Sequence, residues 1–251
     1  MFDDRLTSLS IVLPCHDEEE NVAASIREAT AAATAAAADH EILVVDDGST
    51  DATRAIAEGA AATHAHVRVL VHDTNRGYGA ALRTGIAAAR CDWILLTDAD
   101  LQFDLSELVY FVAPARDHDL VVGYRLARMD PLPRRVNAYA WNRLVGRVFD
   151  LDVRDVDCAI KLIRGDLARG LRLTADGAMI STELVARARL AGARIAQFGV
   201  RHRPRVAGIQ SGSDPVVVLS AFRELRRIRG ELDGGPRPAP SPSEPPHPAA
   251  A

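Results

Sequence analysis

Short apolar runs alternate with alanine-rich segments over the N-terminal part of the chain. Each apolar run opens into a polar loop, as expected of a buried parallel strand. The alanine-rich segments contain few β-branched residues, which favours helices. We therefore expect strands at residues 9–13, 41–45, 67–71 and 93–96, and helices at residues 21–38, 51–62 and 79–89. This alternation predicts an α/β fold, with a mostly parallel sheet and helices on both faces.

The pattern is less regular further along the chain. We expect strands at residues 119–123, 158–163 and 194–200, and helices at residues 137–149, 182–191 and 214–232. The last helix has a favourable N-terminus, because Asp214 suits the N-cap and Pro215 suits the first helical position. Its apolar residues follow at helical spacing, with four arginines around them. The Pro-, Gly-, Ser- and Ala-rich residues 233–251 predict a disordered tail, so we divide the chain into a domain at 1–213, a basic amphipathic helix at 214–232 and this tail.

Composition narrows the possible partners. The chain has 251 residues and a formal net charge of -4, so it has no overall basic field and nucleic acid is not an expected partner. The three cysteines, Cys15, Cys91 and Cys158, are too scattered for a disulfide framework or a zinc site, and they indicate reduced thiols in a cytoplasmic protein. We find no signal-peptide pattern and no apolar run of about 18 residues. We expect any membrane contact to be peripheral or through a partner.

Acidic residues cluster where the predicted strands end. Asp98 and Asp100 follow the strand at 93–96, and two carboxylates one residue apart in a loop can hold Mg²⁺ or Mn²⁺, which prefer oxygen ligands. Gln102 could add a neutral oxygen. Asp46 and Asp47 end the strand at 41–45, either as a β-turn or as ligands of a base or ribose. In parallel sheets such clusters meet at the carboxyl edge, where ligands bind.

Two further polar segments have simpler interpretations. Residues 14–18 close the first strand with Pro14 and Glu18, and they could be no more than a charged helix start. The segment from Asn75 to Gly79 contains Gly77 but lacks the third glycine of a dinucleotide motif and the lysine of a P-loop. We interpret it as close backbone packing near a nucleotide, with a plain turn as the alternative.

Together these motifs resemble glycosyltransferase family 2, and within it the branch of dolichyl- or polyprenyl-phosphate mannosyltransferases. The resemblance covers residues 8–210 and is carried by Ile11-Val12-Leu13-Pro14 with Asp17-Glu18, Val44-Val45-Asp46-Asp47-Gly48-Ser49-Thr50-Asp51, Asn75-Arg76-Gly77-Tyr78-Gly79-Ala80-Ala81, Asp98-Ala99-Asp100-Leu101-Gln102 and Val122-Gly123-Tyr124-Arg125. It implies a GT-A fold and a metal-dependent, inverting hexosyltransferase that uses a GDP- or UDP-sugar.

The resemblance also implies roles for individual residues. The nucleotide-sugar would be bound by Pro14, Glu18, Asp46, Asp47, Asn75, Gly77, Asp98 and Gln102. The metal, Mg²⁺ or Mn²⁺, would be bound by Asp98, Asp100 and Gln102, and Asp98, Asp100 and Arg125 would be the catalytic residues. Acceptor or phosphate groups would be bound by Arg125, Arg134, Arg135 and Arg205. Three stretches depart from the pattern of the branch, mostly on the acceptor side: His16-Asp17, Asp157-Cys158-Ala159-Ile160-Lys161 and Gln210-Ser211.

Chemistry favours a polyprenyl phosphate as the acceptor. A hydroxyl acceptor, on an envelope glycan or a small molecule, needs a general base, and the sequence does not rank Asp152, Asp155, Asp157 and Glu183 for that role. A phosphate is already anionic at neutral pH, since its second pKa is about 6, and arginines would hold it. A sugar nucleotidyltransferase is a rival interpretation, but the loop after the first strand has no glycine. A non-catalytic homologue is another. The helix at 214–232 packs on the core or meets an anionic membrane surface.

Overall fold

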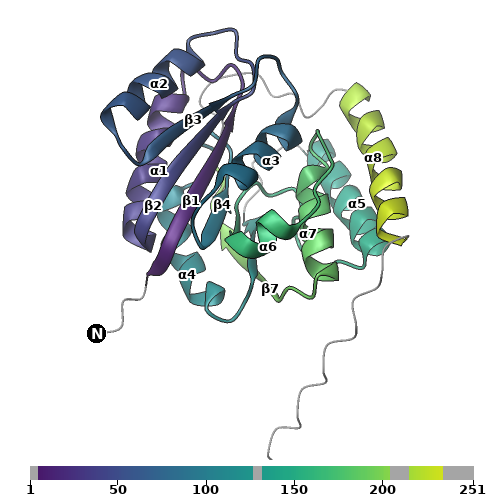
Figure 1. Ribbon diagram of the computed structural model, residues 1–251. Helices are drawn as coiled ribbons and strands as arrows, with labels where there is room; N and C mark the ends of the chain where they lie inside the picture. Colours follow the sequence, from purple (N-terminus) through teal and green to yellow (C-terminus); the bar gives the residue numbers. More distant parts are fainter. Residues whose placement is uncertain (1–4, 127–131, 204–214, 234–251) are drawn as a thin grey trace, which may run out of the picture.

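A seven-stranded sheet forms the centre of the molecule (Figure 1). The computed structural model describes residues 5–126, 132–203 and 215–233. In the helix that begins at residue 132 the side chains are described from residue 139 onward, and in the helix that begins at residue 215 from residue 223 onward. The strands are β1 (Leu6–Cys15), β2 (Ala37–Asp46), β3 (Val67–Val71), β4 (Trp93–Leu96), β5 (Leu120–Arg125), β6 (Lys161–Arg164) and β7 (Ile195–Val200). Their order in the sheet is β3-β2-β1-β4-β6-β5-β7. Among the strands of the described residues, only β6 runs antiparallel to its neighbours, so the predicted mostly parallel α/β sheet is confirmed.

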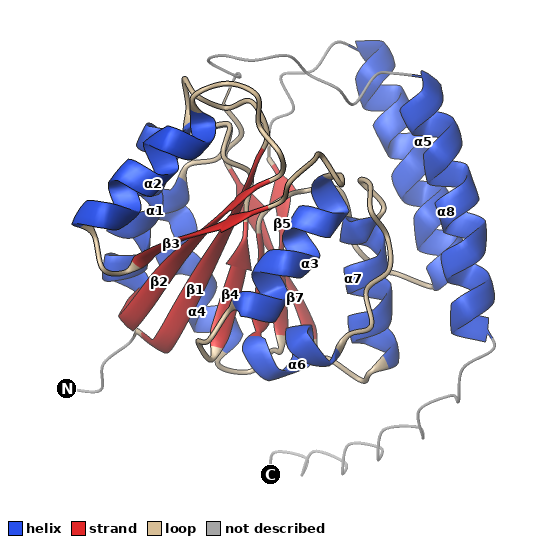
Figure 2. Cartoon of the chain, turned by 45° about the horizontal axis from the view of Figure 1, so that its top comes forward, coloured by secondary structure: helices blue, strands red, loops and turns tan. Residues whose placement is uncertain are grey.

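Helices cover both faces of this sheet (Figure 2). They are α1 (Val22–Ala36), α2 (Thr53–Thr63), α3 (Tyr78–Ala88), α4 (Val109–Ala115), α5 (Leu132–Phe149), α6 (Gly165–Gly170), α7 (Ile180–Leu190) and α8 (Pro215–Asp233), with a short 3₁₀ helix, η1, at Leu105–Leu108. One core contains side chains of α1, α2 and α4, and the other contains side chains of α3, α5, α6, α7 and α8. None of the described helices has the length and apolar character needed to cross a membrane.

The central strands supply both cores because their side chains alternate between the two faces. In β1, Ile11 and Leu13 enter one core while Val12 enters the other. In β2, Ile42 and Leu43 divide in the same way, and all of these side chains are 0% exposed. Burial on both faces explains why these strands are almost continuously apolar in sequence.

Several predicted boundaries differ from the structure. The first helix ends at Ala36, before the predicted residue 38, because the run of alanines contains no stop signal. Helix α5 begins at Leu132, five residues before the predicted start, with Pro133 in the first turn, where its missing N–H is tolerated. Strand β6 begins at Lys161 rather than at residue 158. The helices η1, α4 and α6 were not predicted, since each is too short to show a period. Residues 214 and 234–251 lie outside the described residues.

Candidate functional site

Three polar loops meet at the carboxyl ends of the central strands. Strand β1 lies between β2 and β4, and all three are parallel, so their last residues share one edge of the sheet. The backbone joins them there: Asp47 N donates to Cys15 O at 2.8 Å, and Thr97 N donates to Val12 O at 3.4 Å. The strand order reverses between β1 and β4. Such a switch point is where an open α/β sheet forms a crevice that binds ligands.

The loop after β4 holds the paired carboxylates close to the strand end. Asp98 is half-buried and Asp100 is only 6% exposed. Ser25 Oγ on α1 donates to Ala99 O at 2.6 Å, and Gln102 N donates to Asp100 Oδ1 at 3.1 Å. Leu101 has a φ of 59°, a left-handed conformation that is strained for leucine. Backbone strain next to paired acids is typical of a functional loop.

Tyr78, the first residue of α3, connects the Asn75–Gly79 segment to these acids. The residue is half-buried. Desolvation of its hydroxyl raises the pKa well above the usual value, and the charge of Asp98, a hydrogen bond with Asp98 and the charge of Asp100 raise it further. The Asn75–Gly79 segment and the paired acids therefore form one site. Sequence reasoning placed no role on Tyr78, although its position between two glycines was a signal.

The acids fit a metal ion that completes its shell with substrate oxygens. Among the residues that the structure describes, no group of three or more His, Cys, Asp or Glu side chains could hold a metal ion. Asp98 and Asp100 could supply two hard oxygen ligands, and Mg²⁺ commonly takes the rest from phosphates and water. Gln102 is tied to Arg203, whose N–H donates to Gln102 O at 2.7 Å and whose carbonyl accepts from Gln102 Nε2 at 3.4 Å.

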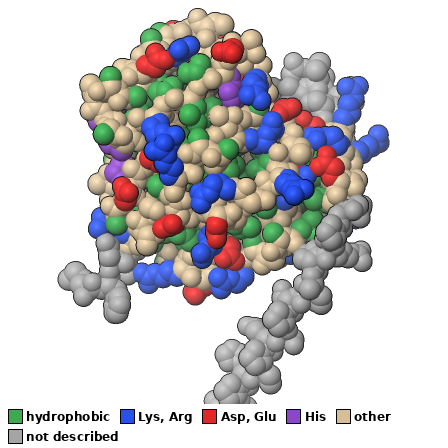
Figure 3. Space-filling view, viewed as in Figure 1, with side chains coloured by type: hydrophobic (Ala, Val, Ile, Leu, Met, Phe, Trp, Pro, Cys, Tyr) green, Lys and Arg blue, Asp and Glu red, His purple; other side chains and the backbone are tan. Residues whose placement is uncertain are grey.

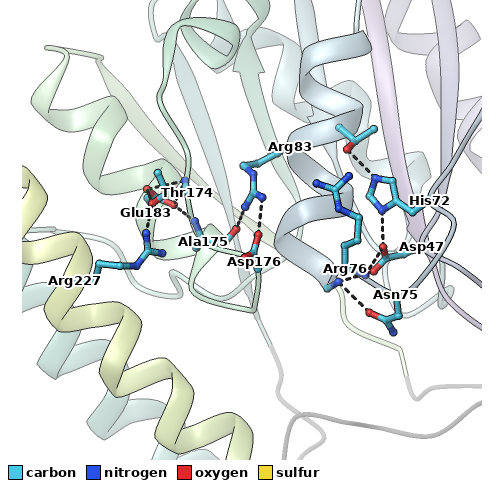
Figure 4. Close-up of polar contacts among 12 residues, drawn as sticks. Asp47, His72, Asn75, Arg76, Arg83, Thr174, Ala175, Asp176, Glu183 and Arg227 are labelled. Atoms are coloured by element: carbon cyan, nitrogen blue, oxygen red, sulfur yellow. Dashed lines mark hydrogen bonds and ion pairs between the residues drawn. The ribbon is translucent and has the colours of Figure 1, made fainter.

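Asp47 holds the neighbouring loop, residues 75–79, through hydrogen bonds to its backbone (Figure 4). Its Oδ1 accepts from Arg76 N at 2.9 Å, and its Oδ2 accepts from Gly77 N at 2.8 Å. His72 Nδ1 lies 2.6 Å from Asp47 Oδ1, and His72 Nε2 lies 2.9 Å from Thr84 Oγ1. At 3% exposure, Asp47 would act on a nucleotide through the backbone that it holds. His72 directly follows the last residue of β3. The sequence predicts polar clusters after the first, second and fourth strands, and none after this one.

The first two acidic segments bind each other. Asp17 Oδ1 accepts from Thr50 N at 2.7 Å, and this backbone hydrogen bond is the main cause of a lowered pKa of Asp17. Glu18 N donates to Thr53 Oγ1 at 2.7 Å, while Glu18 Oε2 accepts from Asn21 Nδ2 at 2.6 Å. Pro14 pairs with Val45 at the end of β1 and β2, and the next pair joins Cys15 to Asp46, which is 1% exposed. The predicted base-side residues therefore lie in one place, with Glu18 half-buried.

The glycines of the Asn75–Gly79 segment allow a second loop to pack on it. Gly77 has a φ of 97°, and a Cβ on Gly77 or Gly79 would collide with the backbone of residues 175–177. Gly79 N donates to Asp176 O at 2.7 Å. Arg83 on α3 clasps the same loop, with hydrogen bonds to Ala175 O and to Asp176 Oδ1 (Figure 4). The close backbone packing expected of this segment is therefore present, while its place beside a nucleotide stays a prediction.

Glu183 anchors that second loop and is a structural residue. It is 0% exposed. Its carboxylate accepts from Thr174 N and Ala175 N, at 2.8 to 3.0 Å, and from Arg187 Nε at 2.7 Å. Arg227 of α8 donates to Thr174 Oγ1 at 2.9 Å, so the loop is also tied to the last helix (Figure 4). A carboxylate with this many donors is poorly placed to accept a proton from a substrate.

The predicted phosphate-binding arginines have different surroundings. Arg125 forms a two-point ion pair with Asp155, with Nε to Oδ2 at 2.6 Å and Nη2 to Oδ1 at 2.8 Å. Arg134 and Arg135 belong to α5, but their side chains lie outside the described residues, as does all of Arg205. Arg125 therefore already has a carboxylate partner, Asp155, in this structure.

The sequence matches the model of glycosyl transferase family 2 over residues 10–170. A dodecaprenyl-phosphate galacturonate synthase of Rhizobium johnstonii is 31% identical over 210 residues, which cover 80% of this chain and 60% of that protein. An undecaprenyl-phosphate 4-deoxy-4-formamido-L-arabinose transferase of Klebsiella pneumoniae is 31% identical over 158 residues, covering 62% of this chain and 48% of that protein. The chain thus spans about half to three-fifths of the length of these curated relatives.

Solved structures share the fold. Glucosyl-3-phosphoglycerate synthase of Mycobacterium tuberculosis with phosphoglyceric acid superposes with a TM-score of 0.70 at 20% identity, covering 89% of this chain and 80% of that one. The same enzyme with Mn²⁺, uridine-diphosphate and phosphoglyceric acid gives a TM-score of 0.66 at 21% identity, covering 92% and 80%. The predicted GT-A fold is confirmed by these neighbours.

Proposed function

The chain belongs to glycosyl transferase family 2, and on that premise we propose that it moves a hexose from a nucleotide-diphosphate sugar to a polyprenyl phosphate, with inversion at the anomeric carbon. The observation that carries the donor half is the position of Asp98 and Asp100. They follow β4 at the switch point of the sheet, where a donor diphosphate and a divalent cation would meet. That cation would offset the negative charge that grows on the departing nucleoside diphosphate.

The state of the candidate bases supports a phosphate acceptor. Glu183 is buried and accepts hydrogen bonds from backbone and arginine, and Asp155 is paired with Arg125. Asp152 and Asp157 are exposed to solvent. A phosphate needs no base, since it is anionic at neutral pH. The two curated relatives named above carry polyprenyl phosphates in their names, which is consistent with this choice.

A transfer assay with two acceptors tests this proposal. With Mn²⁺ and a labelled nucleotide-sugar, we expect label to enter the organic phase when a short polyprenyl phosphate is supplied. The matching polyprenol, which has the same chain and a hydroxyl in place of the phosphate, is the control and should accept no label. Equal transfer to the polyprenol, or transfer only to a water-soluble hydroxyl acceptor, would contradict the proposed phosphate acceptor. Either result would leave the family membership intact.

A lipid acceptor requires the site to reach a membrane surface, and α8 is the element we propose for that contact. In its described part, Leu225 is 7% exposed and Ile228 is 0% exposed, because both belong to the core. The apolar side chains of this part of α8 are therefore packed in the core and do not face a membrane. The exposed arginines Arg223 and Arg226 face outward, and basic side chains gather where α8 lies on the right of Figure 3. Contact would therefore be electrostatic rather than by insertion.

We predict weak binding to anionic liposomes that is lost at high salt, as charge screening requires. Arg223→Glu with Arg226→Glu should abolish sedimentation with the liposomes. Arg27→Glu with Arg54→Glu, on exposed sites of α1 and α2, makes the same change in net charge and should not. Substitution is a cleaner test than removal of α8, which would also take Leu225 and Ile228 out of the core. Failure of the intact protein to sediment at low salt would refute the membrane contact.

A further inference from the structure

Lys161 is the only lysine among the 30 lysine and arginine residues of the chain. It begins β6, it is 1% exposed, and it pairs with Leu96, the last residue of β4. The strand that carries Asp98 into the site therefore has this lysine as its neighbour. A fully buried lysine is rare unless something compensates its charge. Every other residue of this set is arginine. Lysine at this position therefore indicates a site that suits a compact ammonium better than a planar guanidinium.

The surroundings of Lys161 indicate which carboxylate it serves. Its Nζ donates to Cys158 O. Burial, the largest effect, lowers the pKa of Lys161, while Cys158, Asp157, Asp155 and Asp98 act in the opposite direction. Asp155 already has a two-point partner, and Asp157 is exposed to water. Asp98 is the half-buried carboxylate of this group and a proposed metal ligand.

We propose that Lys161 is a positioning residue whose ammonium, carried on the strand that pairs with the end of β4 two residues before Asp98, stabilises the paired acids in the metal-free protein and weakens their hold on a divalent cation. This inference rests on the metal site of the proposed function. It has a distinctive consequence, since repulsion between the ammonium and the cation disappears when the charge is removed. A residue that only supports packing has the opposite effect, because its loss distorts the site and loosens the metal.

Calorimetric titration of Mn²⁺ into Lys161→Met separates the two possibilities. Methionine fills a similar volume without charge, and we expect it to tighten Mn²⁺ binding by about tenfold. Unchanged or weaker binding by Lys161→Met would overturn the proposal. No Mn²⁺ binding by wild type would overturn the metal site itself, and this inference with it.

A measurement on the wild-type side chain stands even if Lys161→Met does not fold. Labelling with ¹³C-lysine gives a single ε-methylene signal, because the chain has one lysine. Paramagnetic Mn²⁺ should broaden that signal, and diamagnetic Mg²⁺ should only shift it. Asp98→Asn with Asp100→Asn should remove both effects. A signal that stays sharp at an Mn²⁺ concentration shown by calorimetry to saturate the protein would place Lys161 away from the ion and end the proposal.

Discussion

Asp100→Ala is expected to abolish sugar transfer while leaving the protein folded. The carboxylate accepts a hydrogen bond from Gln102 N, and the loss of a hydrogen bond of this kind costs about 1 kcal/mol of stability. As a metal ligand it would be worth far more to the reaction, and we expect kcat/KM to fall by at least about 10³-fold. Radiochemical transfer assays and thermal unfolding of the same preparation measure both quantities.

A matched control lies in the same loop. Asp104 caps Ser106 N at 3.2 Å and pairs with Arg203 at 2.7 Å, so Asp104→Ala disturbs the loop without touching the paired acids. It should keep most of the activity. The wild-type enzyme should lose transfer in EDTA and regain it with Mn²⁺ or Mg²⁺. Activity that survives either Asp100→Ala or EDTA would show that sugar transfer needs no metal ion bound at Asp100.

Asp47→Ala is expected to raise the Kd for the nucleotide by about 10- to 100-fold, equivalent to about 1.5–3 kcal/mol. The structure gives the reason: the carboxylate holds the N–H groups of Arg76 and Gly77 and the ring of His72. Without it the loop loses its shape and buried donors lose their acceptor. Stability should therefore fall together with affinity, as calorimetry and thermal unfolding would show.

Two variants separate this loop effect from general damage. Asp47→Asn keeps the shape and one acceptor oxygen, so its effect should be intermediate. Thr84→Val removes only the contact at the far side of His72 and should leave the Kd nearly unchanged. If Asp47→Ala binds the nucleotide as wild type does, Asp47 has no part in the donor site.

The sequence predicts the parts of this molecule that depend on local pattern. The strands β1 to β4 are recognisable because each is an apolar run buried on both faces, and the acids at their ends meet as parallel topology requires. Strand β6 is harder to recognise, since it is short and inserts antiparallel between β4 and β5. Its register depends on neighbours that are far away in the chain.

Pairings between distant side chains explain what sequence reasoning missed in the site. Nothing near Glu183 in sequence shows that its carboxylate holds the loop at Thr174. Arg125 was assigned to phosphate on its motif alone, and only the fold brings it to Asp155, thirty residues away. The sequence shows only that Lys161 is the chain's one lysine. Its position becomes informative when the structure shows that this lysine is buried.

The most direct test of the central claim is calorimetry with UDP, GDP and their sugar conjugates, each in Mn²⁺ and in EDTA. A donor site built on Asp98 and Asp100 should bind one of the two nucleoside diphosphates, and its Kd should rise at least about tenfold when EDTA removes the metal. Asp100→Asn in Mn²⁺ should match wild type in EDTA. Binding of neither nucleotide, or equal binding with and without metal, would contradict the account.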